Sequence, residues 1–245
     1  MPADFPRQLR SALGSWWREH ARTKGVPAAA SLLLAELWGF LRDSTPERRR
    51  SRYGDMEYDW EHRVNTTTGT VAWRERLLGI FHSPYQATDP SAFREMMAAL
   101  SIDFREFTFI DIGSGKGRTL LMASDYPFQK IVGVELIAGL HRAAAENIAA
   151  YQARTPSARG MAIESVCMDA RELVFPETPL VVYLFNPLPE VRLRQVIRHL
   201  QESWRKTPRP VWIVYHNPAL ESALAESQWL QRVSRTEQCS LYKVK

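Results

Sequence analysis

The strongest constraint on the fold is a regular alternation of short apolar runs with helical segments, which begins near Thr108. The runs LVVYLF at 180–185 and VWIVY at 211–215 are continuously apolar, as expected of strands that are covered on both faces. Helical patterns separate the runs, which is typical of parallel strands joined by crossover helices. The sequence therefore predicts a doubly wound α/β domain.

The expected sheet has seven strands. Two runs near the end of the sequence flank a short polar turn, which indicates an antiparallel hairpin. We therefore expect a Rossmann-like sheet that is mostly parallel and ends in this hairpin. The predicted strands are 108–112, 131–135, 161–168, 180–185, 211–215, 230–235 and 240–244, with helices at 118–124, 137–151 and 191–204 between the parallel ones.

The first 69 residues have a different character. Helices are predicted over residues 5–21 and 26–41, and the polar stretch 44–69 has the composition of a linker or an ordered loop. The regular pattern resumes at Thr70. We expect two parts, a helical extension with a loop at 1–69 and the main domain at 70–245.

The main domain is expected to begin with helices. One is predicted at 71–81, and a polar turn leads to another at 91–100. Asp89 and Pro90 open the second helix as a cap followed by proline.

The most apolar stretch, residues 26–41, bears on the question of a membrane. It is interrupted by Glu36 and is shorter than the roughly 20 residues that a span requires. It also starts too far along the sequence, and lacks the cleavage site, to resemble a signal peptide. Leu33, Leu37 and Phe40 recur at helical spacing, so the helix has an apolar face that must pack on something. The protein's own body is the expected partner, and peripheral contact with a membrane surface or another protein is the alternative.

The composition excludes several classes. With 45% hydrophobic and 24% charged residues, the 245-residue sequence is that of an ordinary globular protein. Its two cysteines, Cys167 and Cys239, provide neither a disulfide framework nor a zinc site, and we expect both to be buried in a cytoplasmic protein. The formal net charge of +5 identifies no partner. The Arg48–Arg52 cluster is more typical of a solvated loop, which disfavours nucleic acid.

The segment FIDIGSGKGR at 109–118 carries the chemistry, because it lies where a buried strand leads into a helix. Glycines there let the backbone approach a ligand, and the free N–H groups of the helix start bind polar groups. The dinucleotide fingerprint G-x-G-x-x-G would place a glycine where Arg118 stands, which disfavours NAD and FAD. Glu135 ends the next strand, where a carboxylate can accept both hydroxyls of a ribose. We therefore expect a cofactor that contains a ribose.

The pattern D-x-G-x-G-x-G, followed by an acidic residue at the end of the next strand, resembles the class I S-adenosylmethionine-dependent methyltransferases. The resemblance covers roughly residues 70–245, and the hairpin is similar to that family's extra antiparallel strand. It implies that the glycine loop passes under the methionine part of S-adenosyl-L-methionine and that Glu135 holds the ribose. It also implies that Asp169 and Ala170 border the adenine, with Asp169 accepting its exocyclic amine. The loop residues concerned are Asp111, Gly113, Ser114, Gly115 and Gly117.

Within that family, DIGSGKGRTLLMAS followed by VGVEL resembles bacterial proteins whose glycine motif is similar to that of the histone-lysine methyltransferases without a SET domain. This likeness implies that residues 85–88 lie over the cofactor, with Tyr85 and Thr88 near its methionine end. The substrate-recognition elements of the histone enzymes are not recognisable in the sequence.

Two strand ends supply candidate catalytic groups. Asn186, after the fourth strand, resembles the asparagine of the N-P-P-Tyr loop of amino-methyltransferases, which would border the transferred methyl group. Leu188 and Pro189 replace the proline and aromatic residue of that loop, which disfavours adenine methylation, and a strand-ending turn is the alternative. His216 ends the fifth strand as either a general base or a structural histidine. Lys116 and Arg118, at the start of a helix, are expected to be solvated.

The predicted activity is methyl transfer from S-adenosyl-L-methionine to a nitrogen or oxygen of a protein or small molecule, with Asn186 and Tyr85 as candidate catalytic residues. One alternative is a protein of the same fold that binds the cofactor without catalysis. Another is a nicotinamide-dependent oxidoreductase, which the glycine spacing disfavours. The sequence indicates neither the acceptor nor the oligomeric state.

Overall fold

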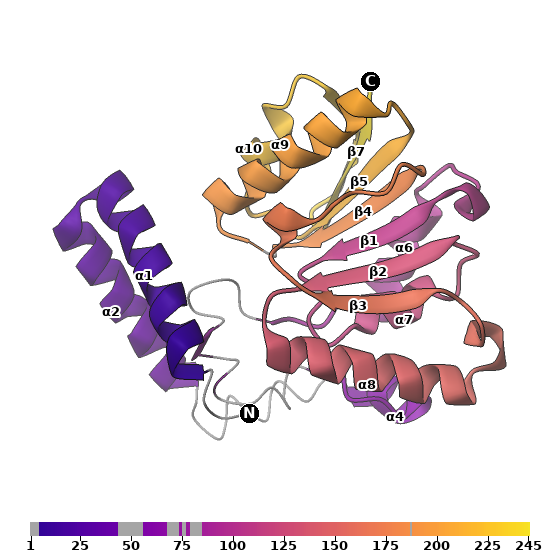
Figure 1. Cartoon of the computed structure of the whole chain (residues 1–245), viewed down its shortest axis with the longest axis horizontal. Coiled ribbons are helices and arrows are strands. Elements are labelled where there is room, and N and C mark those ends of the chain that lie inside the picture. The colour runs from indigo at the N-terminus through magenta and orange to yellow at the C-terminus, as the bar shows by residue number, and fades with distance from the viewer. Residues whose placement is uncertain (1–4, 44–55, 68–73, 75–76, 79–84, 187) are drawn as a thin grey trace. The chain divides into compact units, whose positions relative to one another are not determined.

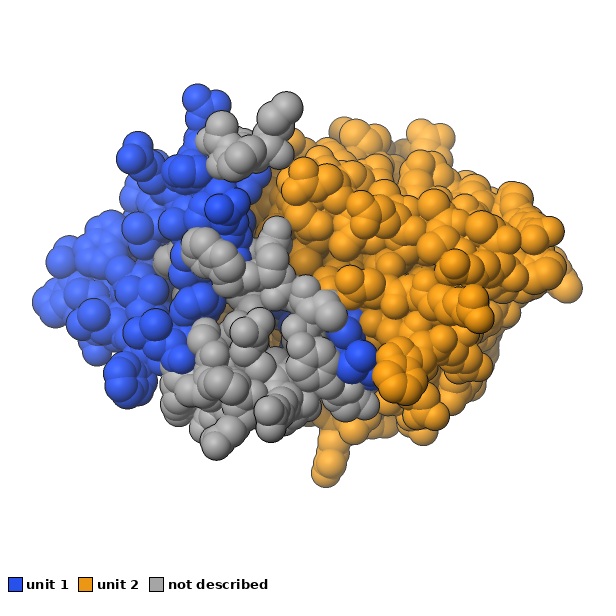
Figure 2. Space-filling view, turned by 90° about the horizontal axis from the view of Figure 1, so that it is seen from below, with its two compact units in different colours: residues 1–56, 67–86 blue, residues 57–66, 87–245 orange. Residues whose placement is uncertain are grey.

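The computed structural model describes residues 5–43, 56–67, 74, 77–78, 85–186 and 188–245. The chain divides into two compact units, coloured separately in Figure 2. Unit 1 comprises residues 1–56 and 67–86, and unit 2 comprises residues 57–66 and 87–245. Residues 57–66 group with the sheet and residues 67–86 group with the N-terminal helices, and the predicted domain boundary at residue 70 stays a prediction.

Unit 2 is built on one seven-stranded sheet in the order β3-β2-β1-β4-β5-β7-β6 (Figure 1). The first five strands are parallel, and β7 pairs antiparallel with both β5 and β6. The predicted Rossmann-like sheet with a terminal hairpin is confirmed. The strands are β1 (Thr108–Ile112), β2 (Lys130–Glu135), β3 (Ile163–Cys167), β4 (Leu180–Phe185), β5 (Val211–His216), β6 (Leu230–Arg235) and β7 (Cys239–Val244).

Helices cover both faces of the sheet (Figure 1), which is why residues 180–184 of β4 are all buried. One core lies under α9 and α10, and the other lies under α6, α7 and α8. Leu140, Ala144 and Ile148 form the buried face of α8, as their spacing predicts. These helices are α6 (Pro90–Ala98), α7 (Arg118–Ala123), α8 (Ala138–Arg154), α9 (Glu190–Lys206) and α10 (Ser222–Ala225).

The register of the sheet places several polar residues on neighbouring strands. Asp111 of β1 lies opposite Gly133 of β2 and Tyr183 of β4. His216, at the end of β5, lies opposite Cys239 at the start of β7. The connections run in opposite directions from β1, so a crevice for a ligand is expected beyond the carboxyl ends of β1 and β4.

The start of α6 has the predicted cap. The Asp89 carboxylate accepts hydrogen bonds from the N–H groups of Ser91 and Ala92, and Pro90 occupies the first turn.

Of the two cysteines predicted to be buried, only one is. Cys239 is buried, but Cys167 is exposed because it ends β3, the strand at the sheet's edge.

Unit 1 contains the helices α1 (Phe5–Lys24) and α2 (Val26–Asp43), close to their predicted bounds. Leu34, Trp38 and Leu41 of α2 are 68%, 68% and 62% exposed. No helix among the described residues is long and apolar enough to cross a membrane. Leu33, Leu37 and Phe40, the residues of the predicted apolar face, are partly buried. Contact of α2 with a membrane surface or another protein stays a prediction.

The polar stretch 44–69 is not only a loop, because it contains the helix α4 (Met56–His62). Glu57 and Asp59 in its first turn and His62 in its last suit the helix dipole. Tyr58 and Asp59 are buried. The Arg48–Arg52 cluster and most of the helix predicted at 71–81 lie outside the described residues.

Gly133 of β2 is the tightest glycine position described. A Cβ atom there would lie 2.6 Å from both the Ser114 Oγ and the Leu120 Cδ1. We expect Gly133→Ala to lower the free energy of unfolding by about 1–3 kcal/mol, because neighbouring groups must shift. Gly14→Ala is the control, since a Cβ at Gly14 in α1 meets nothing within 4 Å. Urea unfolding tests both, and an unchanged midpoint for Gly133→Ala would mean that β2 packs loosely on the loop.

Candidate functional site

The loop between β1 and α7 is held in a shape that only glycine adopts readily. Gly113, Gly115 and Gly117 have φ values of 78°, 56° and 82°, in the left-handed region. The N–H groups of Gly113 and Ser114 donate to the Val134 carbonyl at 2.8 and 3.1 Å. The loop therefore folds back onto the end of β2, and the predicted strand–loop–helix arrangement is present.

Glu135 lies directly against this loop and is 6% exposed. Its Oε2 accepts a hydrogen bond from the Gly115 N–H at 2.9 Å, and its Oε1 accepts one from the Ile137 N–H at 2.7 Å. A carboxylate has about four acceptor positions, so each oxygen can accept another bond. The structure thus brings together Gly115 and Glu135, two residues predicted to bind the cofactor, and leaves Glu135 able to accept two hydroxyls.

Asp111 is a second buried carboxylate beside the loop, at 3% exposure, and it accepts a hydrogen bond from the Thr119 hydroxyl. Burial raises the pKa of Asp111 to about 7, and the charge of Glu135 adds to the effect. Burial also raises the pKa of Glu135, despite the N–H groups that it accepts. A bound cation would favour the charged forms of both groups.

Ser114, in the centre of the loop, has an unused hydrogen-bonding group. Its Oγ is buried and has no partner among the described residues. Leaving a buried hydroxyl unsatisfied costs about 1–3 kcal/mol, so a polar ligand would be stabilised here.

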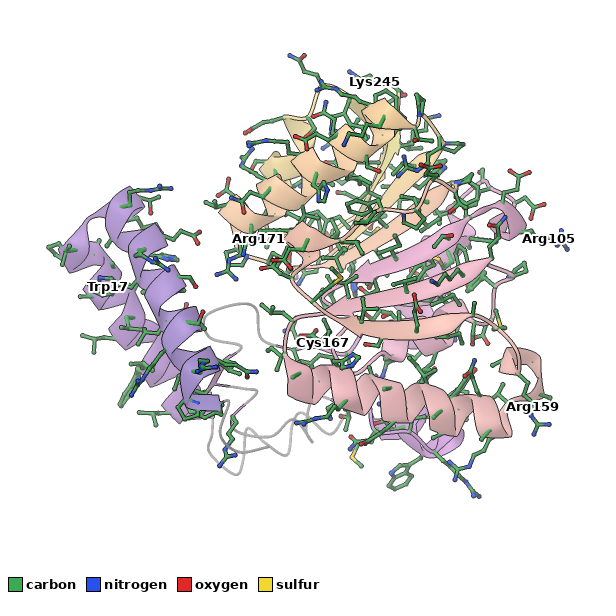
Figure 3. All side chains as sticks on the ribbon, in the orientation of Figure 1. Trp17, Arg105, Arg159, Cys167, Arg171 and Lys245 are labelled. Atoms are coloured by element: carbon green, nitrogen blue, oxygen red, sulfur yellow. The ribbon has the colours of Figure 1, made fainter. Side chains whose placement is uncertain are left out.

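Asp169, the predicted adenine acceptor, is occupied within the chain. Its carboxylate accepts a hydrogen bond from the Arg171 N–H at 2.9 Å and forms an ion pair with the Arg171 guanidinium at 2.6 Å. Arg171 is labelled in Figure 3, in the turn after β3. Burial raises the pKa of Asp169, but the bonds and charge from Arg171 outweigh it and keep that pKa below its usual value. Ala170 lies in the apolar core. The adenine contact stays a prediction.

Asn186, the predicted catalytic amide, ties the ends of β4 and β5 together. Its Nδ2 donates to the Asn217 carbonyl at 2.6 Å, and its Oδ1 accepts from the Tyr215 hydroxyl at 3.0 Å and the Ala219 N–H at 3.2 Å. Asn186 and Asn217 also have left-handed backbones, with φ of 44° and 46°. In this structure, therefore, the amide has the role of a strand-ending turn, and its catalytic role is not tested.

A buried chain of hydrogen bonds joins Thr88 to the end of β5. The Tyr183 hydroxyl lies 2.9 Å from the Thr88 Oγ1 and 2.8 Å from the His216 Nδ1. Phe185 stacks on the His216 ring with the centroids 4.1 Å apart. Burial lowers the pKa of His216 to about 4, so the imidazole is neutral at pH 7 and is a weak base.

Tyr85, the other candidate catalytic residue, belongs to unit 1 and is half-buried. The other predicted site residues belong to unit 2. Its place beside the cofactor stays a prediction.

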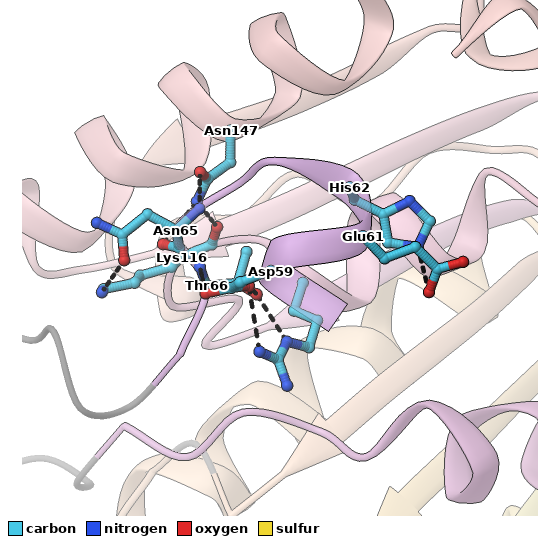
Figure 4. Close-up of polar contacts among 8 residues, drawn as sticks. Asp59, Glu61, His62, Asn65, Thr66, Lys116 and Asn147 are labelled. Atoms are coloured by element: carbon cyan, nitrogen blue, oxygen red, sulfur yellow. Dashed lines mark hydrogen bonds and ion pairs between the residues drawn. The ribbon is translucent and has the colours of Figure 1, made fainter. Parts of the chain in front are cut away.

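Arg118 was expected to be solvated, and that expectation was wrong, because its side chain is 2% exposed. Its partners Asp59, in α4, and Thr66, after α4, are labelled in Figure 4. The Arg118 Nε donates to the Thr66 Oγ1 at 2.6 Å, and its guanidinium lies 3.3 Å from the Asp59 Oδ1. The Thr66 N–H also donates to the Asp59 Oδ2 at 2.7 Å. A buried ion pair thus joins residues 57–66 to the start of α7.

Lys116 is buried too, contrary to expectation, at 3% exposure. Its Nζ donates to the Asn65 Oδ1 at 3.2 Å (Figure 4). The Asn147 side chain of α8 accepts from the Asn65 N–H at 2.8 Å and donates to the Lys116 carbonyl at 3.0 Å. These contacts could not be predicted, because polar residues in a stretch without periodicity are equally typical of solvent exposure.

Comparisons with known proteins come from structure alone, since no protein-family model and no curated protein sequence matches the chain. An RNA methyltransferase from Salinibacter ruber, in complex with S-adenosyl-L-homocysteine, is 21% identical with a TM-score of 0.43, over 64% of this chain and 92% of that one. The ribosomal protein L11 methylase from Lactobacillus delbrueckii subsp. bulgaricus is 18% identical with a TM-score of 0.41, over 63% and 76%. The methyltransferase domain of bacterial CtHen1-C is 13% identical with a TM-score of 0.46, over 63% and 96%.

All three similar structures are methyltransferases by name, but at these TM-scores no function is transferred from them to this chain. The finer resemblance to histone-lysine methyltransferases is not confirmed by these matches. One of the three is named for RNA. They therefore lend no support to the expectation that nucleic acid is not a partner.

The buried ion pair predicts a large effect of Asp59→Asn on stability. The variant removes the Asp59 charge that lies 3.3 Å from the buried Arg118 guanidinium, and we expect a loss of about 3–5 kcal/mol in the free energy of unfolding. Asp103→Asn is the matched control, because Asp103 is exposed and lies 3.6 Å from an exposed Arg105. The control should lose less than about 1 kcal/mol. Equal losses in urea unfolding would contradict a special role for the buried pair.

The raised pKa of Asp111 predicts that Asp111→Asn stabilises the protein in alkali. The pKa of Asp111 is about 7 in the folded state and 3.8 in the unfolded state. The free energy of unfolding therefore falls as the pH rises from about 4 to about 7. The variant avoids this loss and should be more stable than wild type by about 2–4 kcal/mol at pH 8, with little gain at pH 4. Unfolding curves at both pH values test the effect, and a gain that is independent of pH would refute the assignment.

Proposed function

We propose that the chain is an S-adenosyl-L-methionine-dependent methyltransferase that acts on a nitrogen or oxygen of a protein or small-molecule acceptor. The observation that carries this proposal is the contact between the glycine loop and the buried Glu135 carboxylate at the carboxyl ends of β1 and β2. This contact supports the proposal because a carboxylate at the end of β2 can accept ribose hydroxyls beside a backbone that a ligand can approach closely.

The described residues suit the cofactor in three ways. The Glu135 oxygens can each accept one more hydrogen bond, which matches the two ribose hydroxyls. The Ser114 hydroxyl has an unused hydrogen-bonding capacity. The buried carboxylates of Asp111 and Glu135 favour a positively charged ligand, and S-adenosyl-L-methionine is a sulfonium. When bound, it supplies a methyl group that is already activated for transfer.

The thioether that is released when the methyl group is transferred is neutral and needs no acid. The chain's main task is therefore to hold the acceptor in line with the methyl group. Such positioning contributes about 7–11 kcal/mol. An amine of pKa about 10.4 must also be neutral to react, which costs about 4.6 kcal/mol at pH 7. With a pKa of about 4, His216 does not hold the released proton at neutral pH, so the proton passes to solvent or to another group.

The proposal includes the residue roles that the resemblance implies. Residues 85–88 are inferred to lie over the cofactor, as in proteins with a similar glycine motif. Asp169 is inferred to exchange its bonds with Arg171 for one with the adenine amine. Asn186 is inferred to border the methyl group.

A protein that binds the cofactor without catalysis is the second candidate. One observation favours it, since both polar atoms of the Asn186 amide already form bonds within the chain. Incubating the protein with radiolabelled S-adenosyl-L-methionine and pools of proteins, nucleic acids and metabolites separates the two candidates. Label transfer to any pool supports the enzyme, and cofactor binding without transfer supports the second candidate.

Calorimetric titration with S-adenosyl-L-homocysteine tests the cofactor, with NAD as the control ligand. We expect binding of the former only, weakened about 10- to 100-fold in Glu135→Ala, because a hydrogen bond to a charged group contributes about 1.5–3 kcal/mol. Glu135→Gln is the second variant, since it keeps an acceptor oxygen if the alanine variant unfolds. Unchanged affinity in a folded variant would remove Glu135 from the site, and NAD binding would favour an oxidoreductase.

A further inference from the structure

A cavity of about 360 Å³ lies between α6 and the β6–β7 hairpin. Its size suits a small side chain or metabolite rather than a whole nucleoside cofactor. Met96 of α6, together with Cys239 and Leu241 of β7, gives it buried apolar walls. The residues that line it are Ala92, Glu95, Met96, Ala99, His216, Ser234, Thr236, Glu237, Gln238, Cys239 and Leu241.

The two charged residues that line this cavity are both acidic. Glu95 and Glu237 line it and are exposed, and its lining includes neither lysine nor arginine. No ion pair is found for either glutamate among the described residues. A ligand with an ammonium group would therefore be attracted, whereas a carboxylate or a phosphate would be repelled.

His216 also lines the cavity, and it is 92% buried, with 8% of its surface exposed. Its Nδ1 bonds the Tyr183 hydroxyl at 2.8 Å, and its Nε2 has no partner among the described residues. This ring nitrogen can bond a polar group of a ligand. Its neutral state adds no positive charge to oppose a cation.

The cavity is linked to the glycine loop through the sheet. His216 bonds Tyr183, which lies opposite Asp111 on the neighbouring strand, and Asp111 precedes the first loop glycine by two residues. Neighbouring strands are about 4.8 Å apart. Tyr183 also bonds Thr88, one of the predicted cofactor residues. Two side chains, His216 and Tyr183, thus connect the cavity to Thr88 and Asp111, which are predicted to border the cofactor.

We propose that this cavity binds an ammonium group on a short aliphatic stem, with the stem against Met96 and Leu241 and the charge between Glu95 and Glu237. Resting on the proposed function, this cation is part of the methyl acceptor, which makes the acceptor an organic amine. The proposal assigns to the cavity the binding of the acceptor's ammonium group. It does not assign the atom that receives the methyl group.

The test uses the full chain with methyl-¹³C-labelled methionine and follows the Met96 signal during titration with n-butylammonium chloride. Met96→Leu assigns the signal. n-Butanol is the neutral control of similar shape, and sodium butyrate is the anionic one. We expect a saturable shift with n-butylammonium, and much weaker binding of the alcohol and the acid.

A pair of matched variants isolates the charge. Glu95→Gln with Glu237→Gln should weaken n-butylammonium binding about three- to tenfold, as expected for two exposed carboxylates. Glu146→Gln with Glu202→Gln removes the same net charge from exposed positions on α8 and α9 and should leave the affinity unchanged. Equal weakening in both pairs, or equal binding of the alcohol, would overturn the inference.

Titration of the same samples with S-adenosyl-L-homocysteine separates this inference from the proposed function. If S-adenosyl-L-homocysteine binds and n-butylammonium does not shift the Met96 signal, the cation site is wrong and the cofactor proposal stands. If n-butylammonium binds and S-adenosyl-L-homocysteine does not, the cation site stands and its assignment to a methyl acceptor fails.

Discussion

The hydrogen bond from the Gly115 N–H to the Glu135 carboxylate holds the candidate site together, because it fixes the loop after β1 against the end of β2. Two further bonds, from Gly113 and Ser114 to the Val134 carbonyl, do the same from the backbone. The left-handed conformations of the loop glycines are needed to make these contacts together. The predicted ribose acceptor and the predicted cradle are therefore one unit, and a change to either affects both.

The site also keeps two carboxylates away from water at a cost in stability. Asp111 and Glu135 are both buried, and burial raises the pKa of each. The paired Asp59 and Arg118 side chains lie beside the same loop and anchor it to residues 57–66. Strain and unfavourable charge at a functional site persist only where the surrounding structure fixes the conformation. Here the surrounding support comes from a segment distant in sequence, which explains why it groups with the sheet.

The fold was largely predictable because short, continuous apolar runs between helical segments are typical of buried strands. The run 180–185 matches β4 at both ends, and the hairpin strand 230–235 matches β6. The expected strand at 161–168 was too long, since edge strand β3 extends only from Ile163 to Cys167. Periodicity indicates where a segment is buried, and an edge strand is buried on fewer sides.

The glycine loop and its acidic partner were also predictable, because Gly113, Gly115 and Glu135 follow from strand ends and local backbone needs. The Asp59–Arg118 pair and the Thr88–Tyr183–His216 chain were not, because each joins residues far apart in sequence. A buried charge looks like a solvated one until its partner is known. The anchoring role of the polar residues in 57–66 could therefore not be predicted from the sequence.

The position of β7 has a consequence for how the molecule folds. β7 follows β6 in the chain yet lies between β5 and β6, so β6 has no strand to pair with until β7 is formed. β6 therefore joins the sheet with β7 as a hairpin, or after β7 has paired with β5. The β6–β7 pairing is local in sequence, whereas Thr108 of β1 pairs with the distant Leu180 of β4, so the cavity wall from Ser234 to Leu241 can form without waiting for the parallel strands.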